Sequence, residues 1–329
     1  MKKNVAIIWG GYSSEIVVSE KSMNGIYSFL DKDRYSVYKI KIDKKGWTAN
    51  IEDKEYNVDK NDFSIAFDSE KIKIDFAYIT IHGTPGEDGR LQGYFDMLDI
   101  PYSSCDWMTS AITFNKFVCN NFLKNFGFYV AKSVYLKRET KYNINSIAES
   151  LNFPVFIKPN TGGSSFATTK VKSIDKMQEA IDFAFGEASD VIIESFISGR
   201  EVTCGCYKTG EREVMLPITE VITENEFFDY NAKYMGEVQE ITPADLSPEM
   251  TINIQQLTSR IYDLVGAKGI IRADFIISQN TPYLLEVNTT PGMTVTSFIP
   301  QQVKAAGLSM TDVLSEIIEC EYQKTQKSL

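Results

Sequence analysis

Residues 270–288 most constrain what this chain can fold into, because they predict a β-hairpin with polar groups on one face. Ile270–Ile277 and Tyr283–Asn288 have strand composition, and the segment between them is rich in turn residues. Folding the chain back about Asn280 pairs Asp274 with Glu286 and Arg272 with Asn288. Side chains alternate along a strand, so these four share one face. The other face is expected to be a core face with Ile271, Phe275, Ile277, Tyr283, Leu285 and Val287.

Two carboxylates that face each other in a sheet repel, so a positive charge is expected between Asp274 and Glu286. These carboxylates and the Asn288 carbonyl are hard oxygen ligands that suit Mg²⁺, which completes its shell with water and phosphate oxygens. A solvated acidic face is the alternative. Arg272 beside the trio favours a site where a divalent cation meets phosphate.

Composition and charge exclude several classes of protein. The 329 residues suffice for two or three domains, and the formal net charge of −10 without a dense Lys/Arg cluster argues against a nucleic-acid partner. No apolar run has the length of a membrane span, and a signal peptide is not expected. Five scattered cysteines predict reduced thiols in a cytoplasmic protein. A single His makes Ser-His-Asp and Cys-His catalysis poor candidates.

Residues 1–104 predict a small doubly wound, parallel-sheet domain of the α/β class. Strands are expected at 5–9, 35–42 and 76–81, with a polar stretch at 52–68 between the second and the third. A helix over Glu15–Leu30 follows the turn at 10–14, with Ser13 or Ser14 as its N-cap. The glycines do not form G-x-G-x-x-G, so a dinucleotide-binding dehydrogenase is a distant alternative.

The remainder predicts two α+β units, residues 105–194 and 195–329. The first is expected to contain a helix over 109–126 that includes Lys116, strands at 155–157 and 166–171, a helix at 174–185 and a strand at 191–194. The second is expected to contain strands at 201–207 and 213–221, a long polar loop, a helix at 252–265 and the hairpin.

The Gly/Ser loop at 158–165 is a second candidate for phosphate binding. A P-loop would open a helix, whereas this loop joins two predicted strands. Its N–H and hydroxyl donors could close over phosphates, and Lys158 could contact a phosphate or an adenine nitrogen. An ordinary hairpin turn is the alternative. ATP held between two β-layers, with Mg²⁺ on one of them, accounts for both the loop and the acidic hairpin.

A series of motifs along nearly the whole chain resembles the ATP-grasp superfamily and, within it, the D-alanine–D-alanine ligase family. Their order matches that family, and the second and last motifs are the most specific. The motifs are Gly10–Glu15, His82–Gly89 with Leu91–Gly93, Lys158–Pro159 with Gly163–Ser165, Phe228–Tyr230 with Ala232–Tyr234, Arg272–Asp274, and Leu285–Thr294.

The resemblance implies an ATP-grasp fold of three domains and a ligation in two steps. The carboxylate of one D-alanine would attack the γ-phosphate of ATP, and the amine of a second D-alanine would displace phosphate from the acyl phosphate. It also implies a cytoplasmic enzyme of peptidoglycan precursor synthesis that forms homodimers. Phosphorylation supplies the leaving group that a carboxylate lacks, and cations would neutralise charge developing on oxygen.

The resemblance further implies roles at the nucleotide. Asp274, Glu286 and Asn288 would hold two Mg²⁺ or Mn²⁺ ions, and Arg272 would stabilise the oxyanion and the transferring phosphoryl group. The groups expected to contact the nucleotide are Lys116, Lys158 and Lys233 at the phosphates, Glu194 and the Ile197 backbone at the adenine, and Glu201 at the ribose.

At the amino-acid substrates, the resemblance implies that Glu15 binds the ammonium of the first D-alanine and shares a hydrogen-bond network with Ser164 and Tyr234. His82 would border this pocket. The second substrate's carboxylate would be bound by Ser297 and the backbone N–H of Phe298.

Several of these residues also have a plain structural explanation. An acid in a first helical turn is favoured by the helix dipole, which would explain Glu15. His82 could be a loop hydrogen-bonder, and Lys116 and Lys233 could be solvated lysines. Two alternatives for the whole chain also stay open. One is a ligase that uses D-serine or D-lactate as acceptor, and the other is a nucleotide-binding regulatory module without turnover.

Overall fold

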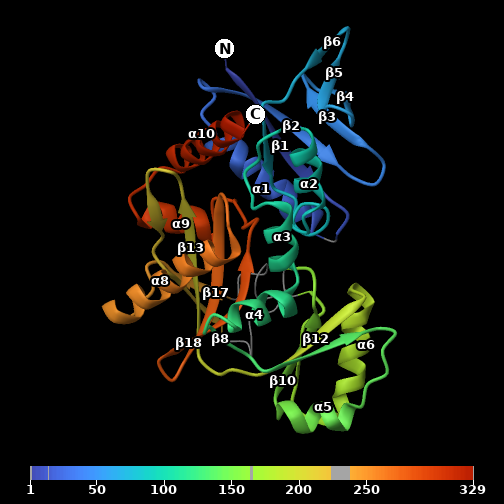
Figure 1. Cartoon of the computed structure of the whole chain (residues 1–329), viewed down its shortest axis with the longest axis vertical. Coiled ribbons are helices and arrows are strands. Elements are labelled where there is room, and N and C mark those ends of the chain that lie inside the picture. Colours follow the sequence, from blue (N-terminus) through green and yellow to red (C-terminus); the bar gives the residue numbers. More distant parts are fainter. Residues whose placement is uncertain (1, 14, 164–165, 224–237, 329) are drawn as a thin grey trace.

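The structure is a computed structural model, and it describes residues 2–13, 15–163, 166–223 and 238–328. Within these residues the strands form three β-sheets, and apart from β8 each sheet is built from strands that are consecutive in the chain (Figure 1). Helices pack against each sheet, so the mixed α/β class predicted from the sequence is confirmed.

The first sheet has a parallel centre and an antiparallel extension. β1 is parallel to both β2 and β7, and the strands from β2 to β6 form an antiparallel series in the order β6-β5-β4-β3-β2-β1-β7. The elements are β1 (Lys3–Gly10), α1 (Ile16–Phe29), β2 (Tyr35–Ile42), β3 (Trp47–Ile51), β4 (Lys54–Asp59), β5 (Ser64–Phe67), β6 (Glu70–Ile72), β7 (Phe76–Ile79) and α2 (Arg90–Met97).

The expected polar stretch at 52–68 is wrong, because β4 and β5 lie within it. Glu52 and Asp53 both have positive φ and form a two-residue turn between β3 and β4, a geometry that matches the twist of paired strands. Phe63 and Ile65 are buried and attach this extension to the core of the sheet. Several positions of β4, β5 and β6 are exposed, which explains why these strands carry so many polar residues.

The N-cap of α1 also differs from the prediction. Glu15 is the N-cap residue, with φ −90° and ψ 14°, and Ser14 lies outside the described residues. The Ser13 hydroxyl instead donates to the His82 carbonyl at 3.0 Å, which connects the turn before α1 to the loop after β7.

The helix expected over 109–126 is two helices, α3 (Trp107–Phe114) and α4 (Lys116–Lys124). Asn115 between them has an extended backbone, and its side chain accepts a 3.0 Å hydrogen bond from Val118 N–H, which makes it the N-cap of α4. Lys116 is therefore the first residue of a helix instead of lying within one.

The second sheet is antiparallel, in the order β11-β10-β12-β9, and β10 and β11 flank the Gly/Ser loop as expected. Its apolar face packs against the helices around a core that includes Ile157, Ile181 and Ile193. The elements are β9 (Ser133–Lys137), α5 (Ile144–Leu151), β10 (Val155–Pro159), β11 (Thr169–Val171), the 3₁₀ turn Ile174–Lys176, α6 (Met177–Glu187) and β12 (Asp190–Ser195).

The third sheet has the order β16-β15-β13-β17-β18-β8, with β14 paired to β13. The strand expected over 213–221 is divided into β14 and β15, and β8 reaches this sheet from before β9. The elements are β8 (Tyr129–Val130), β13 (Arg200–Lys208), β14 (Glu213–Met215), β15 (Thr219–Thr223), β16 (Val238–Ile241), α8 (Pro248–Val265), β17 (Ile270–Ser278), β18 (Thr281–Asn288), α9 (Phe298–Ala305) and α10 (Met310–Ser328).

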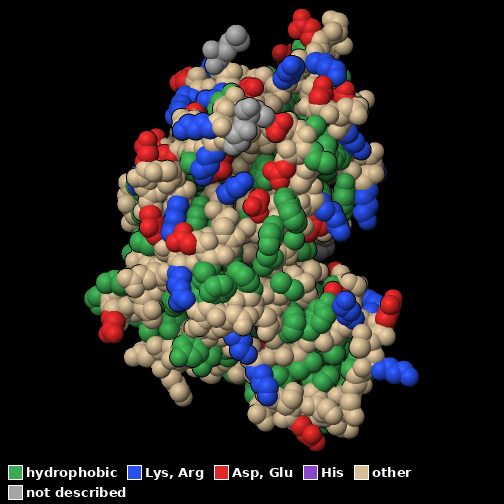
Figure 2. All heavy atoms as spheres, in the orientation of Figure 1, with side chains coloured by type: hydrophobic (Ala, Val, Ile, Leu, Met, Phe, Trp, Pro, Cys, Tyr) green, Lys and Arg blue, Asp and Glu red, His purple; other side chains and the backbone are tan. Residues whose placement is uncertain are grey.

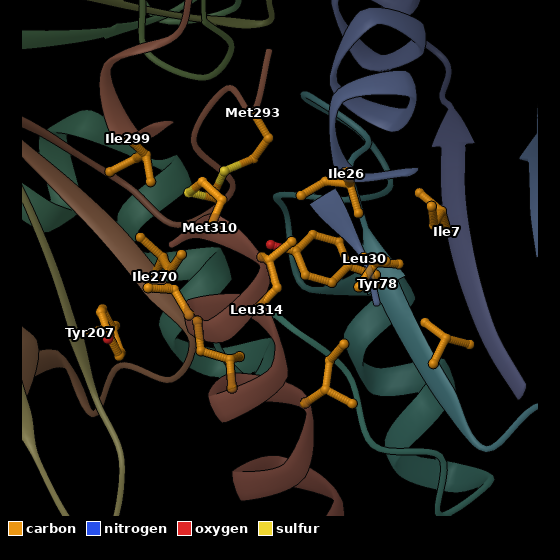
Figure 3. Close-up of a cluster of buried hydrophobic side chains, with 14 of the residues drawn as sticks. Ile7, Ile26, Leu30, Tyr78, Tyr207, Ile270, Met293, Ile299, Met310 and Leu314 are labelled. Atoms are coloured by element: carbon orange, nitrogen blue, oxygen red, sulfur yellow. The ribbon is translucent and has the colours of Figure 1, made fainter. Parts of the chain in front are cut away.

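The first sheet and the C-terminal helices share one hydrophobic core. α10 contributes Met310 and Leu314, α1 contributes Ile26 and β1 contributes Ile7, and all four side chains are buried (Figure 3). Figure 1 shows the consequence, with α10 lying beside α1. Both ends of the chain therefore hold α1, and with it Glu15, in place relative to the third sheet.

On the face shown in Figure 2, Lys and Arg side chains are interspersed with Asp and Glu. None of the helices formed by the described residues combines the length and the apolarity needed to cross a membrane.

The cap at Asn115 gives a test of this part of the fold. Asn115→Ala should lower the free energy of unfolding by about 1 kcal/mol, because α4 loses the side chain that satisfies a free N–H. Urea-induced unfolding measures the change. Asn115→Ser keeps an acceptor and should lose much less, so equal losses for the two variants would contradict the capping role.

Candidate active site

The β17–β18 hairpin has the register expected for the functional face. Asp274 pairs with Glu286 and Arg272 pairs with Asn288. Gln279 and Asn280 form a two-residue turn in which both have positive φ, 47° and 64°, a conformation that Asn tolerates well. The four polar side chains therefore meet on one face, as the sequence predicts.

The opposite face differs, because the strands slip by one residue between Asp274 and Phe275. β18 has one extra residue there, Leu285, and such a bulge reverses which side chains face inward beyond it. Leu284 is consequently buried in place of Leu285, and Tyr283 is only partly buried, so the expected core positions of Leu285 and Tyr283 are wrong. The Leu285 carbonyl accepts a 3.2 Å hydrogen bond from Asn120.

Arg272 and Asp274 form a bidentate ion pair at the centre of the polar face. Nε and Nη2 of Arg272 donate to the two oxygens of Asp274 at 2.8 and 2.7 Å. Burial by itself lowers the pKa of Arg272, but the adjacent Asp274 carboxylate outweighs it and the pKa lies above its usual value. Paired buried charges of this geometry hold both side chains in fixed orientations.

Thr203 on β13 was not singled out from the sequence, yet it belongs to this centre. Its hydroxyl donates to Asp274 Oδ1 at 2.5 Å, and the two residues are directly paired across β13 and β17. Period-two alternation along the predicted strand 201–207 could have placed it on the polar face, but only once the pairing of β13 with β17 was known.

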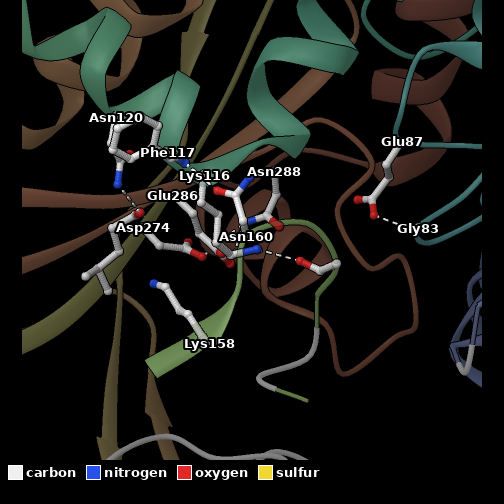
Figure 4. Close-up of polar contacts among 12 residues, drawn as sticks. Gly83, Glu87, Lys116, Phe117, Asn120, Lys158, Asn160, Asp274, Glu286 and Asn288 are labelled. Atoms are coloured by element: carbon white, nitrogen blue, oxygen red, sulfur yellow. Dashed lines mark hydrogen bonds and ion pairs between the residues drawn. The ribbon is translucent and has the colours of Figure 1, made fainter. Parts of the chain in front are cut away.

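Two lysines approach the hairpin face from other elements (Figure 4). Lys116 Nζ, at the start of α4, lies 3.5 Å from Glu286, and Lys158 Nζ, on β10, lies 2.6 Å from Glu194 on β12. Burial tends to lower the pKa of Lys158, but Glu194 outweighs burial and the pKa is raised. The Lys158 ammonium group therefore stays positive beside Glu194.

A cavity of about 820 Å³ lies between the second and third sheets. It combines apolar walls with cations, which is the character of a site for a nucleotide with a flat base and a charged tail. The lining residues that the sequence singled out are Glu15, Lys116, Lys158, Glu194, Ile197, Glu201, Arg272, Asp274, Glu286 and Phe298, and apolar lining includes Phe156, Phe196, Ile276 and Leu285.

A second cavity, of about 650 Å³, adjoins the first. Glu15, Lys116, Arg272, Glu286 and Phe298 line both. Some residues line only the second cavity. They include His82, Asn288, Ser297 and residues 289–292. The polar hairpin face thus lies where a large ligand in one cavity and a small one in the other would meet.

The N-terminus of α9 opens toward this second cavity. Ser297 is its N-cap residue, and its Oγ accepts a 3.0 Å hydrogen bond from Thr294 N–H. Phe298 is the first helical residue, and its ring centroid lies 5.2 Å from the Arg272 guanidinium carbon. Free N–H groups at a helix start attract carboxylates.

Glu15 lies against the Gly/Ser loop. A Cβ added to Gly163 would lie 3.1 Å from Oε1 of Glu15, so only glycine lets the loop pass this closely without displacement. Of the other predicted site residues, Ser164, Lys233 and Tyr234 lie outside the described residues.

The donor set fits a divalent cation in part. Asn288 Nδ2 donates to Asp274 Oδ2 at 3.0 Å and lies 3.5 Å from Glu286 Oε1. The Asn288 amide therefore lies between the two carboxylates. A half-turn of the amide would present its oxygen there. The described residues contain no cluster of three or more His, Cys, Asp or Glu side chains that could enclose a metal. Phosphate and water would have to complete the shell, as is usual for Mg²⁺.

Comparison with known families decides the identity of this fold. Two family models match, D-ala D-ala ligase N-terminus over residues 4–105 and D-ala D-ala ligase C-terminus over residues 122–319. The chain belongs to the D-alanine–D-alanine ligase family. This confirms the resemblance and makes the chain an ATP-dependent ligase with an ATP-grasp fold.

Relatives in this family match over nearly their full length. The chain is 57% identical over 323 residues to the D-alanine–D-alanine ligase of Parabacteroides distasonis, covering 98% of each. It is 56% identical over 324 residues to that of Bacteroides fragilis, covering 98% of this chain and 100% of the relative.

Solved structures with the same fold include two that bear on ligands. The VanG D-Ala:D-Ser ligase from Enterococcus faecalis matches with a TM-score of 0.87 at 29% identity, over 98% of this chain and 100% of that one. The D-alanine–D-alanine ligase from Bacillus anthracis complexed with ATP matches with a TM-score of 0.79 at 27% identity, over 99% of this chain and 100% of that one.

Glu87 is a further acid that lines the second cavity, and its role was not predicted from the sequence. Its Oε2 accepts a 2.6 Å hydrogen bond from Gly83 N–H (Figure 4). Burial, followed by repulsion from Glu15, raises the pKa of Glu87 to about 8. In the unfolded ligase its pKa would return to about 4.5.

Glu87 therefore makes stability depend on pH. Between the unfolded and folded pKa values the folded chain holds more protons, so the stabilising contribution is complete below pH 4.5 and is lost as the pH approaches 8. Relative to Glu87→Gln, the wild type should lose up to about 1.4 kcal/mol of unfolding free energy per pH unit in this window. Urea titrations from pH 5 to about 8 measure the difference.

If the unfolding free energies of wild type and Glu87→Gln ran parallel across this pH range, the perturbed Glu87 carboxyl would be refuted.

Proposed function

We propose that this chain joins two D-alanines to D-alanyl-D-alanine, with ATP converted to ADP and phosphate, for peptidoglycan precursor synthesis. The observation that supports this most is the polar face of the hairpin, which borders a large cavity with the character of a nucleotide site and a smaller one beside it. The relatives at 57% and 56% identity bear the name of this activity.

In the first step, the carboxylate of one D-alanine attacks the γ-phosphate of ATP and an acyl phosphate forms. Lys116, Lys158 and Lys233 contact the phosphates. Support for the first two comes from their positions against Glu286 and Glu194 at the cavity wall, 3.5 and 2.6 Å away, where an anionic phosphate would gain from their charge. Arg272 stabilises the transferring phosphoryl group.

In the second step, the amine of the other D-alanine attacks the acyl carbon and phosphate leaves. Arg272 stabilises the oxyanion of the tetrahedral intermediate, because its buried guanidinium is held by Asp274 and lines both cavities. Ser297 and the Phe298 N–H bind the carboxylate of the second substrate, for which a helix start is suited.

Glu15 binds the ammonium of the first D-alanine, and His82 borders the same pocket. Both side chains line the second cavity, and Glu15 reaches the first as well. A hydrogen-bond network of Glu15 with Ser164 and Tyr234 would close the Gly/Ser loop over the reactants. The close approach of Gly163 to Glu15 supports such a closed arrangement.

The remaining nucleotide contacts are proposed from the lining of the larger cavity. Glu194 and the Ile197 backbone meet the adenine edge, and Glu201 meets the ribose hydroxyls. Asp274, Glu286 and Asn288 hold two Mg²⁺ or Mn²⁺ ions, which would neutralise phosphate charge in the transition state.

Three broader properties are proposed on the resemblance to the family. The chain is divided into units 1–104, 105–194 and 195–329, it forms homodimers, and it works in the cytoplasm, where its substrate ATP is present. Small molecules are its ligands, and the mixed surface charge in Figure 2 supports the expectation that nucleic acid is not among them.

A panel of second substrates tests which acceptor the enzyme prefers. Phosphate release from ATP should be fastest with D-alanine and slower with D-alanine plus D-serine or D-lactate. The structural match to a D-Ala:D-Ser ligase at 29% identity makes D-serine the essential comparison. Faster release with D-serine or D-lactate would establish the rival acceptor, and ATP binding without any release would establish a regulatory module.

Glu286→Gln tests the metal assignment. The substitution keeps size and hydrogen bonding but removes the charge that faces Asp274, so phosphate release should fall by roughly a hundredfold or more. Thermal unfolding should stay cooperative. Glu213→Gln on the same sheet is the matched control, since Glu213 pairs with Lys208 away from both cavities and should leave turnover intact. Near-normal release from Glu286→Gln would remove Glu286 from the site.

A further inference from the structure

Ser22 lies where three segments of the reaction centre meet. It belongs to α1, its side chain is 1% exposed, and its hydroxyl oxygen accepts a 3.4 Å hydrogen bond from Met293 N–H. The same oxygen lies 3.2 Å from Nε2 of His82, the only His of the chain. One hydroxyl therefore connects α1 with the His82 ring and with the segment that joins β18 to α9.

Close packing keeps this junction in place. Gly25 lies one turn after Ser22, and a Cβ at this position would clash with the Met293 carbonyl, so α1 and the 291–294 segment are in direct backbone contact. On the other side, the Ser13 hydroxyl holds the His82 carbonyl at 3.0 Å. His82 is thus held by its backbone and by its ring.

The hydrogen-bond pattern decides where the imidazole proton lies. The Met293 N–H can only donate, so the Ser22 oxygen accepts it. The hydroxyl hydrogen then needs its own acceptor, and a helical serine can use the carbonyl four residues earlier. No carbonyl within the described segments accepts the Ser22 hydroxyl, which leaves Nε2 of His82. A neutral ring that accepts at Nε2 carries its proton on Nδ1.

We propose that Ser22 is a positioning residue that holds His82 as the neutral tautomer protonated on Nδ1. The consequence rests on the proposed function. His82 lines the cavity assigned to the first D-alanine, and a neutral Nδ1–H can donate to an oxygen of that substrate. Ser22 does not touch the reactants, so it acts through the orientation and protonation of the ring.

Nitrogen NMR of the whole protein tests this directly. Because the chain has one His, long-range ¹H–¹⁵N spectra of untagged protein report the two nitrogens of His82 without ambiguity. At a pH where the ring is neutral, the wild type should show a protonated Nδ1 and an unprotonated Nε2. Ser22→Ala should shift both nitrogens toward values averaged over the two tautomers.

Two further variants separate positioning from packing. Ser22→Thr keeps the hydroxyl and should restore the wild-type nitrogen pattern. Ser19→Ala removes another buried hydroxyl of α1, which accepts from Gly10 N–H at 3.0 Å and does not contact His82, so the nitrogen pattern should not change. In kinetics, Ser22→Ala should raise KM for D-alanine at the first site roughly threefold to tenfold, the range expected for one lost hydrogen bond, with a smaller change in kcat.

The outcomes distinguish this role from the proposed function. A wild-type ring protonated on Nε2, or an unchanged pattern in Ser22→Ala, would overturn the role of Ser22 even if D-alanine-dependent phosphate release were normal. The wild type could instead show the expected tautomer but release no phosphate with D-alanine. That result would support the positioning of the ring and overturn the proposed function.

Discussion

The ion pair between Arg272 and Asp274 determines how the reaction centre is arranged. Two charges removed from water are tolerated only when their geometry is good and their other hydrogen-bonding positions are used, and here Thr203 and Asn288 also donate to Asp274. This fixes one carboxylate and one guanidinium on the face that Glu286 shares. Arg272 lines both cavities, which supports the proposal that it acts in phosphoryl transfer on one side and in acyl transfer on the other.

Local features of the backbone place the other site residues around this ion pair. A two-residue turn sets the hairpin register, and a bulge at Leu285 turns that side chain into the cavity wall while Asn120 holds its carbonyl. A helix break at Asn115 puts Lys116 at the start of α4. The core shared by α1 and α10 (Figure 3) holds α1 in place, and Glu15, the N-cap residue of α1, lines both cavities.

Sequence patterns predicted the parts of this arrangement that depend on local periodicity. The polar face of the hairpin followed from period-two alternation, and the ordered motifs led to the correct family. The bulge at Leu285 reversed two expected core positions, because an inserted residue leaves no mark in the composition of a strand. Thr203 and Ser22 were missed because their partners, Asp274 and Met293, are distant in the sequence. The roles of Ser164, Lys233 and Tyr234 stay predictions, since these residues lie outside the described parts of the chain.

Anomalous diffraction from crystals grown with Mn²⁺ and ADP is the most direct test of the central claim, that the hairpin face holds divalent cations against a nucleotide tail. We expect an anomalous peak within bonding distance of both carboxylates, Asp274 and Glu286, and of an ADP phosphate oxygen. A bound nucleotide whose only manganese peak contacts neither carboxylate would contradict the account.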